Sequence, residues 1–319
     1  MGLRKTCFLI IYTNFYGRVQ SEHPVPLSNC PLCQDTDLRP WFLFHTSNVT
    51  RCGTCGFVML DPQPDDAILA KIYGETYFIG NGAAETRNMN DWLKRGTAKL
   101  QLAEIEAALY PAQQNNSALT LLEIGCGLGN FLHEAHQQGY KVRGIDVSES
   151  AVARANTTLG APLVQVGHLE TADFTLESFD VVVMADVIEH VRDPKAFIGL
   201  VKDLVKPDGL IFVAVPSLDS LSAKLMGRHW MEFKLEHLYY FDKATLTRLL
   251  SEAGFIDIRI RPGRKLLNLY YIIEHFNKFP VTILSLLLRL VGLVIPSVLQ
   301  KKPFKIVASG INATARKPR

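Results

Sequence analysis

A glycine-rich loop with a nearby carboxylate is the strongest chemical signal in this 319-residue sequence. The apolar run 119–124 leads into Gly125, Gly127 and Gly129, and glycines at such a turn let the backbone bend sharply and approach a ligand closely. The next apolar run ends in Asp146, whose carboxylate can hold the vicinal hydroxyls of a ribose at the carboxyl end of a strand. Loop and acid together predict a pocket for a nucleoside ligand.

The glycine spacing argues against a dinucleotide site. A G-x-G-x-x-G fingerprint needs glycine at its sixth position, but counting from Gly125 or Gly127 gives Asn130 or Leu132. A dehydrogenase of the Rossmann type is therefore a weaker interpretation. A tight strand-to-helix turn with an acidic helix cap is the structural alternative to any ligand pocket.

Two Glu-His pairs could remove a proton from an acceptor. Glu189-His190 follows the apolar run 179–185, and Glu236-His237 lies in the aromatic-rich stretch 230–241. Histidine titrates near neutral pH, and a neighbouring carboxylate can orient it as a base. For His190 the alternative is a structural hydrogen bond at the start of a helix, because Asp193-Pro194 reads as a helix cap. For His237 a structural role stays equally open.

Four cysteines have the spacing of a metal site. Cys30, Cys33, Cys52 and Cys55 give C-x2-C-x18-C-x2-C, which suits two knuckles that hold one zinc ion through four thiolates. Such a closed site predicts a structural Zn²⁺, and a pair of redox-active C-x-x-C units is the alternative. Cys7 and Cys126 are assigned no metal.

Short apolar runs alternate with helical stretches from residue 118 onward, which predicts an α/β domain with a mostly parallel sheet and helices on both faces. Residues 65–110 also show helical spacing. We expect strands at 119–124, 141–146, 162–166, 179–185, 209–215, 255–262 and 304–315, and helices at about 129–138, 149–159, 193–205 and 243–253.

Residues 119–262 resemble the class I S-adenosylmethionine-dependent methyltransferases. The matching pieces are LLEIGCGLGNF, GIDVS, FDVVVMADVIEHVRDP and LVKPDGLIFVAVPS, in the family's order. The resemblance implies a Rossmann-like, seven-stranded sheet and S-adenosylmethionine as the methyl donor. The donor-binding residues that it implies are Glu123, Gly125, Cys126, Gly127 and Gly129 for the methionine part, Asp146 and Val147 for the ribose, His168 and Leu169 near the adenine, and Asp186 facing the methyl group.

The segment EHLYYF at 236–241 is similar to a methyltransferase subgroup of the type 11/12/23 kind, often found in sugar, polysaccharide or secondary-metabolite pathways. That resemblance implies His237, with Glu236 and His190 as further catalytic candidates, acting on a small-molecule or carrier-linked acceptor. An aromatic hydroxyl expected nearby is replaced by Lys234 or Leu235. The alternatives are O-methylation of a quinone or hydroxylated aromatic, and a non-catalytic zinc-ribbon protein that retains the fold.

These patterns divide the chain into an extension (1–25), a zinc ribbon (26–60), a linker and helical lid (61–117) and a methyltransferase domain (118–319) with an apolar helical insert (266–303). The ribbon resembles the amino-terminal region of the same subgroup, and some ribosomal RNA methyltransferases also begin with a zinc module. The net charge is only +3, and Arg39 and Arg51 are the ribbon's only full cations, which argues against nucleic acid as a partner.

The apolar segment 279–300 is long enough to span a bilayer but contains Arg289. A single crossing would also separate the final strand from its sheet. We therefore expect a helix between Pro280 and Pro296 that packs on the domain or on a second subunit, with peripheral membrane contact as the alternative. The cysteine usage and the lack of an export signal predict a cytoplasmic protein, with membrane association and homo-oligomers left open.

Overall fold

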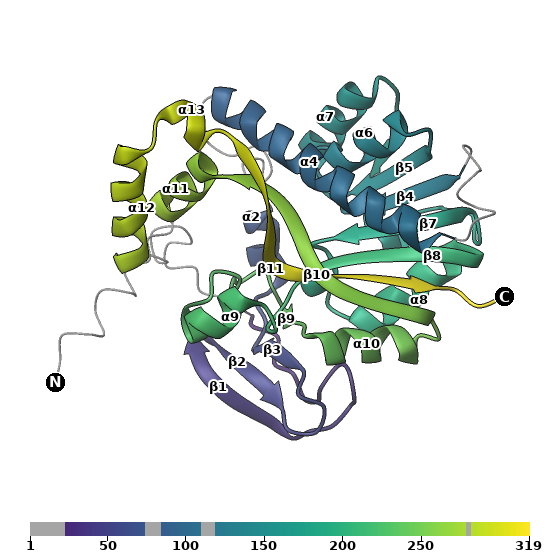
Figure 1. The fold of residues 1–319 in the computed structure, drawn as a ribbon. Coiled ribbons are helices and arrows are strands. Elements are labelled where there is room, and N and C mark those ends of the chain that lie inside the picture. The colour runs from purple at the N-terminus through teal and green to yellow at the C-terminus, as the bar shows by residue number, and fades with distance from the viewer. Residues whose placement is uncertain (1–22, 74–83, 110–118, 279–281) are drawn as a thin grey trace.

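The computed structural model describes residues 23–73, 84–109, 119–278 and 282–319. Its main element is a seven-stranded sheet with strand order β10-β11-β8-β7-β4-β5-β6. The strands are β4 (Thr120–Ile124), β5 (Lys141–Asp146), β6 (Val164–Val166), β7 (Phe179–Ala185), β8 (Val205–Pro216), β10 (Ile256–Asn268) and β11 (Pro303–Arg316). Neighbouring strands from β6 to β8 are parallel, while β11 pairs antiparallel with both β8 and β10. The predicted Rossmann-like methyltransferase sheet is confirmed (Figure 1).

The sheet is buried because alternate side chains of its central strands point to opposite faces. Leu122, Val182 and Val213 belong to one apolar cluster, which also holds side chains of α8 (Pro194–Leu204) and α10 (Lys243–Glu252). Leu121, Val181 and Phe212 belong to a second cluster with α4 (Ala84–Ala108), α6 (Asn130–Gln137) and α7 (Glu149–Leu159). Helices therefore cover both faces, as the near-continuous apolar strands require.

The observed elements agree closely with the expected ones. The predicted helices at 129–138, 149–159, 193–205 and 243–253 correspond to α6, α7, α8 and α10. Asp193 caps α8, its Oδ1 accepting hydrogen bonds from the backbone N–H groups of Lys195 and Ala196 at 3.0 Å, and Pro194 occupies the first turn as expected. Of the helical region at 65–110, the described parts are α2 (Asp66–Ile72) and α4. Most of the extension at 1–25 lies outside the described residues.

The cysteine-bearing segment forms a second, four-stranded sheet with order β1-β2-β3-β9. Its first three strands are β1 (Leu38–Phe44), β2 (Ser47–Cys52) and β3 (Val58–Asp61). The fourth, β9 (Tyr239–Tyr240), comes from the EHLYYF segment and pairs antiparallel with β3. One sheet therefore joins the amino-terminal module to the segment that carries His237, which the sequence did not predict.

The expected apolar insert is a set of helices at the tip of the long β10–β11 ribbon (Figure 1). It consists of α11 (Leu269–Lys278), α12 (Thr282–Val294) and α13 (Ser297–Gln300). The helix expected between Pro280 and Pro296 corresponds to α12, which ends at Val294, and Pro296 precedes α13, whereas Pro280 lies outside the described residues. Among the described helices, none is both long and apolar enough to cross a membrane.

Candidate active site

The glycine loop connects β4 to α6 and adopts the conformation that only glycine takes without strain. Gly125, Gly127 and Gly129 have φ of 69°, 50° and 73°. A Cβ added to Gly125 would lie 2.5 Å from Val187 Cγ2, and one added to Gly129 would lie 2.9 Å from the Cβ of Ala155. All three predicted glycines therefore suit the turn, and Gly125 and Gly129 are also needed for close packing.

Asp146 lies directly under this loop, at the carboxyl end of β5. Its Oδ2 accepts a 2.8 Å hydrogen bond from the backbone N–H of Gly127, and its Oδ1 accepts a 2.9 Å bond from that of Ser148. Burial raises the pKa of Asp146, and these backbone donors act against that shift. Each carboxylate oxygen can accept a second hydrogen bond, so the pair of oxygens can also receive two ribose hydroxyls.

Glu123 places a second carboxyl group below the loop. It is buried, and no described residue donates a hydrogen bond to its Oε2. Burial raises its pKa well above the ordinary value, and the nearby charge of Asp146 raises it further. An unpartnered acceptor in this position could receive an ammonium group such as that of a bound methionine moiety.

The other predicted donor residues differ in exposure. The Cys126 thiol lies in the apolar core, with its Sγ 3.1 Å from where a Gly144 Cβ would be, so only the backbone of Cys126 can face a ligand. Val147 is exposed beside Asp146. His168 is exposed and Leu169 is buried at the carboxyl end of β6. These positions border the strand ends where the sequence placed the adenine.

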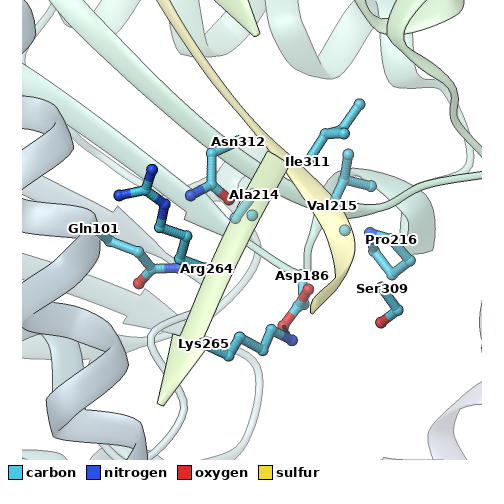
Figure 2. A pocket seen from close by; sticks show the side chains of 12 residues that line it. Gln101, Asp186, Ala214, Val215, Pro216, Arg264, Lys265, Ser309, Ile311 and Asn312 are labelled. Atoms are coloured by element: carbon cyan, nitrogen blue, oxygen red, sulfur yellow. Dashed lines mark ion pairs between the residues drawn. The ribbon is translucent and has the colours of Figure 1, made fainter. Parts of the chain in front are cut away.

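Asp186 ends β7 with φ of 56°, an uncommon conformation for a residue with a side chain. Lys265 reaches toward it from β10, with Nζ 3.7 Å from Asp186 Oδ2 (Figure 2). This charge raises the pKa of Lys265. Both side chains line a small hollow between the end of β8 and the middle of β10 and β11, together with Gln101, Arg264 and Asn312. Arg264 and Lys265 were not predicted as site residues, because both lie in an edge strand and match no motif.

Glu189, His190 and His237 form a buried cluster beyond β7. One ligand atom from each of the three lies within 4.8 Å of the others, and the rings of His190 and His237 are 4.7 Å apart. The backbone holds them together, because Leu238 donates a 2.8 Å hydrogen bond from its N–H to the carbonyl of Glu189. Val187 packs on Gly125, so the cluster adjoins the glycine loop. Both predicted Glu-His pairs therefore meet, although Glu236 contributes its backbone carbonyl rather than its carboxyl group.

Burial disfavours the charged form of all three members of the cluster. Burial lowers the pKa of His190 to about 4 and that of His237 well below its usual value. Burial raises the pKa of Glu189, and the charge of Asp186 raises it further. Among the described residues, no hydrogen-bond partner is found for either carboxyl oxygen of Glu189 or for the Nδ1 of His237. These unpartnered atoms can accept a proton or hold a cation.

The aromatic hydroxyl that the family resemblance led us to expect at 234–235 comes from a different part of the chain. Tyr73, which follows α2, places its hydroxyl 2.7 Å from His190 Nδ1. The same nitrogen lies 2.9 Å from the backbone carbonyl of Glu236. Lys234 instead forms a 3.1 Å ion pair with Glu232. Tyr73 was missed because its segment showed only helical spacing.

The four predicted cysteines meet at one point. All four Sγ atoms lie within 4.8 Å of one another, with 3.6 Å between Cys30 and Cys55 and 3.5 Å between Cys33 and Cys52. A tetrahedral zinc ion with bonds of about 2.3 Å separates its sulfur ligands by roughly 3.8 Å, so the cluster fits such an ion. The positive φ of Gly56 (77°) closes the second knuckle.

Comparison with known proteins gives the family. A family profile described as "Methyltransferase domain" matches residues 94–259, just over half of the chain. The chain belongs to this methyltransferase family. The family resemblance read from the sequence motifs is thereby confirmed, and the matched residues include the glycine loop, Asp146 and all three residues of the buried cluster.

Named relatives are similar to this methyltransferase over its central part. The ubiquinone biosynthesis O-methyltransferase of Caulobacter vibrioides is 40% identical over 120 residues, covering 35% of this chain and 48% of the relative. The enzyme of that name from Rhodopseudomonas palustris is 33% identical over 122 residues, covering 37% and 44%. The match thus spans about half the length of these relatives.

A solved structure also shares the fold. The phosphoethanolamine N-methyltransferase 2 of Haemonchus contortus, in complex with phosphomonomethylethanolamine and S-adenosylhomocysteine, superposes with a TM-score of 0.52. Its sequence identity is 18%, and the alignment covers 82% of this chain and 63% of the other. This likeness agrees with the seven-stranded sheet.

Proposed function

We propose that this methyltransferase moves a methyl group from S-adenosylmethionine to a hydroxyl group of a quinol or another hydroxylated aromatic. The observation that carries the proposal is the buried Glu189, His190 and His237 cluster beside the glycine loop, because a neutral histidine there can take a hydroxyl proton. The names of the sequence relatives support an aromatic hydroxyl over a sugar acceptor.

The glycine loop and Asp146 fit the donor. The backbone of Gly125–Gly129 leaves room for the methionine part, Glu123 Oε2 offers an acceptor to its ammonium group, and Asp146 offers two oxygens to the ribose. A sulfonium supplies a methyl group that leaves readily, so the protein mainly has to align the acceptor. Val147, His168 and Leu169 would border the nucleoside, and Asp186 its methyl-bearing end.

His237 is the proposed base. Its unpartnered Nδ1 can accept the acceptor's hydroxyl proton as the oxygen forms its bond to the methyl carbon and the carbon–sulfur bond breaks. His190 is held by Tyr73 and the Glu236 carbonyl, which gives it a positioning role against the His237 ring. The unpartnered carboxyl oxygens of Glu189 lie where they could stabilise the positive charge that a histidine of the pair gains on accepting the proton.

The cysteine module would hold a structural zinc ion that supports the base. Phe57 follows the second knuckle, stacks on Tyr239 with ring centroids 5.4 Å apart, and is followed by β3, which pairs with β9. A rigid knuckle therefore fixes the strand that begins two residues after His237. This arrangement supports treating 26–60 as a zinc ribbon and 118–319 as the catalytic domain.

Acceptor profiling tests the proposal. Purified protein is incubated with labelled S-adenosylmethionine and a catechol, a hydroquinone, a sugar nucleotide or no acceptor, and product is measured by mass. We expect methylation on oxygen of the aromatic acceptors, lost in His237→Gln and retained in His229→Gln, an exposed histidine on a different segment. Methylation of the sugar alone, or on carbon, would refute the acceptor class.

A further inference from the structure

The helices at the tip of the β10–β11 ribbon carry an unusual number of exposed apolar side chains. Eight of the exposed large hydrophobic residues among those described lie on α12 and α13, including Leu290, Leu293, Val294 and Val298. Leu293 and Val294 are each 83% exposed. Figure 1 shows these helices at the far end of the ribbon, away from the main sheet. A contiguous apolar surface of this kind indicates an interaction site.

Residues along one side of α12 hold this helix against α11 and α13. Ser285 donates a 3.0 Å hydrogen bond from Oγ to the carbonyl of Phe276, and a Cβ added to Gly292 would lie 3.0 Å from Ile273 of α11. Gln300 donates from Nε2 to the carbonyls of Gly292 and Ile295 at 2.8 Å. These contacts satisfy the inner side of the hairpin and leave the leucines of the other side exposed among the described residues.

The charge on α12, on α13 and on the residues after them has one sign, and Glu274 on α11 is the one acidic residue of the described hairpin. From His275 to Arg319 the sequence contains eight lysines and arginines and no aspartate or glutamate. Exposed Arg289 donates a 2.9 Å hydrogen bond from Nε to Asn277 Oδ1 of α11, at the border between the inner side and the exposed leucines, and Lys301 and Lys302 directly follow α13. Cations beside exposed leucines complement the phosphates and acyl chains of an anionic bilayer. Two copies face to face would instead bring these cations together with no acid from the segment to neutralise them.

The length of α12 limits how deeply the hairpin can enter a bilayer. Thirteen residues extend about 20 Å, shorter than a hydrocarbon core of about 30 Å. The final strand β11 must also return to the sheet, so the hairpin can enter a bilayer from one side only. An interfacial position satisfies both conditions.

We propose that the α11–α13 hairpin binds an anionic phospholipid surface. The outer leucines and valines of α12 and α13 would lie among the acyl chains, and Arg289, Lys301 and Lys302 among the phosphates. This binding needs no particular acceptor. It would hold the tip of the ribbon at the bilayer, while the hollow beside Asp186 is lined by residues further along the same two strands.

Vesicle flotation of the full-length protein tests this binding. We expect the protein to float with phosphatidylcholine vesicles that contain phosphatidylglycerol, less with phosphatidylcholine alone, and less as salt rises. Leu286→Gln/Leu290→Gln/Leu293→Gln should weaken vesicle binding at least about tenfold, because three apolar side chains that would enter the bilayer are lost. Lys301→Gln/Lys302→Gln should lower both the binding and its salt dependence.

The matched control is Leu43→Gln/Leu176→Gln, which changes equally exposed leucines on other elements and should bind as the unmodified protein does. Donor affinity, measured on every variant, reports that the protein is folded. Equal flotation of the triple variant would overturn the proposal. Failure of the unmodified protein to float would also overturn it. If the unmodified protein then proved to be a dimer that the triple substitution dissociates, the apolar surface would be a subunit interface instead.

Discussion

Asp146→Asn is the substitution that most directly tests the donor site. The carboxylate accepts one hydrogen bond from each of Gly127 and Ser148, and it has two further lone pairs for the ribose. Asparagine keeps the shape but replaces one oxygen with an N–H2 group. If its oxygen stays with Ser148, the amide nitrogen faces the backbone N–H of Gly127, and one ribose hydroxyl loses a charged acceptor.

A hydrogen bond to a charged group contributes about 1.5–3 kcal/mol. Since about 1.4 kcal/mol corresponds to a factor of ten, S-adenosylmethionine and its demethylated product should each bind roughly 10- to 100-fold more weakly. The mismatch at Gly127 should also lower the free energy of unfolding by about 1–3 kcal/mol. Removing a buried charge whose pKa burial has raised will offset part of this loss.

Isothermal calorimetry with both nucleosides measures the affinity, and circular dichroism measures the unfolding. Asp180→Asn is the matched control, because Asp180 also accepts a 2.8 Å hydrogen bond from a backbone N–H, that of Thr120, and pairs with Lys206 at the opposite end of β7. It should lose stability without losing donor affinity. A folded Asp146→Asn protein with unchanged affinity would refute the assignment of the ribose site.

Four further outcomes are expected. His237→Gln should lower kcat about 10²- to 10⁴-fold in a methyl-transfer assay while calorimetry shows unchanged donor affinity, and loss of affinity instead would assign His237 to donor binding. Tyr73→Phe removes the hydroxyl 2.7 Å from His190 and should lower kcat about tenfold, because one hydrogen bond is lost. An unchanged rate and an unchanged pH profile would contradict a role of Tyr73 in positioning His190. Cys52→Ser should contain less zinc by metal analysis, and its methyl-transfer rate should fall more than its donor affinity because β3 supports β9. Full activity without zinc would contradict a role of the cysteine module in supporting the site. Because the pKa of His190 is lowered from 6.5 to about 4, the unfolded chain binds its proton first as pH falls, so up to about 3 kcal/mol of stability present above pH 6.5 should be lost by pH 4. Urea titrations at several pH values should show that the free energy of unfolding falls less steeply between pH 6.5 and 4 in His190→Gln than in the unmodified protein. Equal pH dependence of the two proteins would contradict the lowered pKa of His190.

The local elements were predictable because they depend on near neighbours in the chain. Apolar runs such as 179–185 mark buried strands, and Asp193-Pro194 marks a helix start, whatever the rest of the chain does. Three glycines after an apolar strand predicted a sharp backbone turn, and the structure has positive φ at all three. Two C-x-x-C pairs predicted one cluster because knuckle geometry is itself local.

Contacts between distant segments required the tertiary structure. His190 and the carbonyl of Glu236 are 46 residues apart, and Tyr73 approaches His190 across 117 residues. Neither contact leaves a periodic signal, because each depends on how β3, β9 and α2 pack rather than on burial of a repeating face. The same holds for Lys265 beside Asp186, where a strand at the edge of the sheet meets the end of a central one.

The sequence by itself therefore determined the order of strands and helices, the glycine loop with Asp146, the four-cysteine cluster and the presence of an apolar insert. The tertiary structure alone decided that segments from both Glu-His pairs meet at one buried site, that a strand of the four-cysteine module pairs with the strand beside it, and that the insert's leucines face outward. The physical reason is that hydrophobic periodicity records whether a side chain is buried. It does not record which distant side chain lies against it.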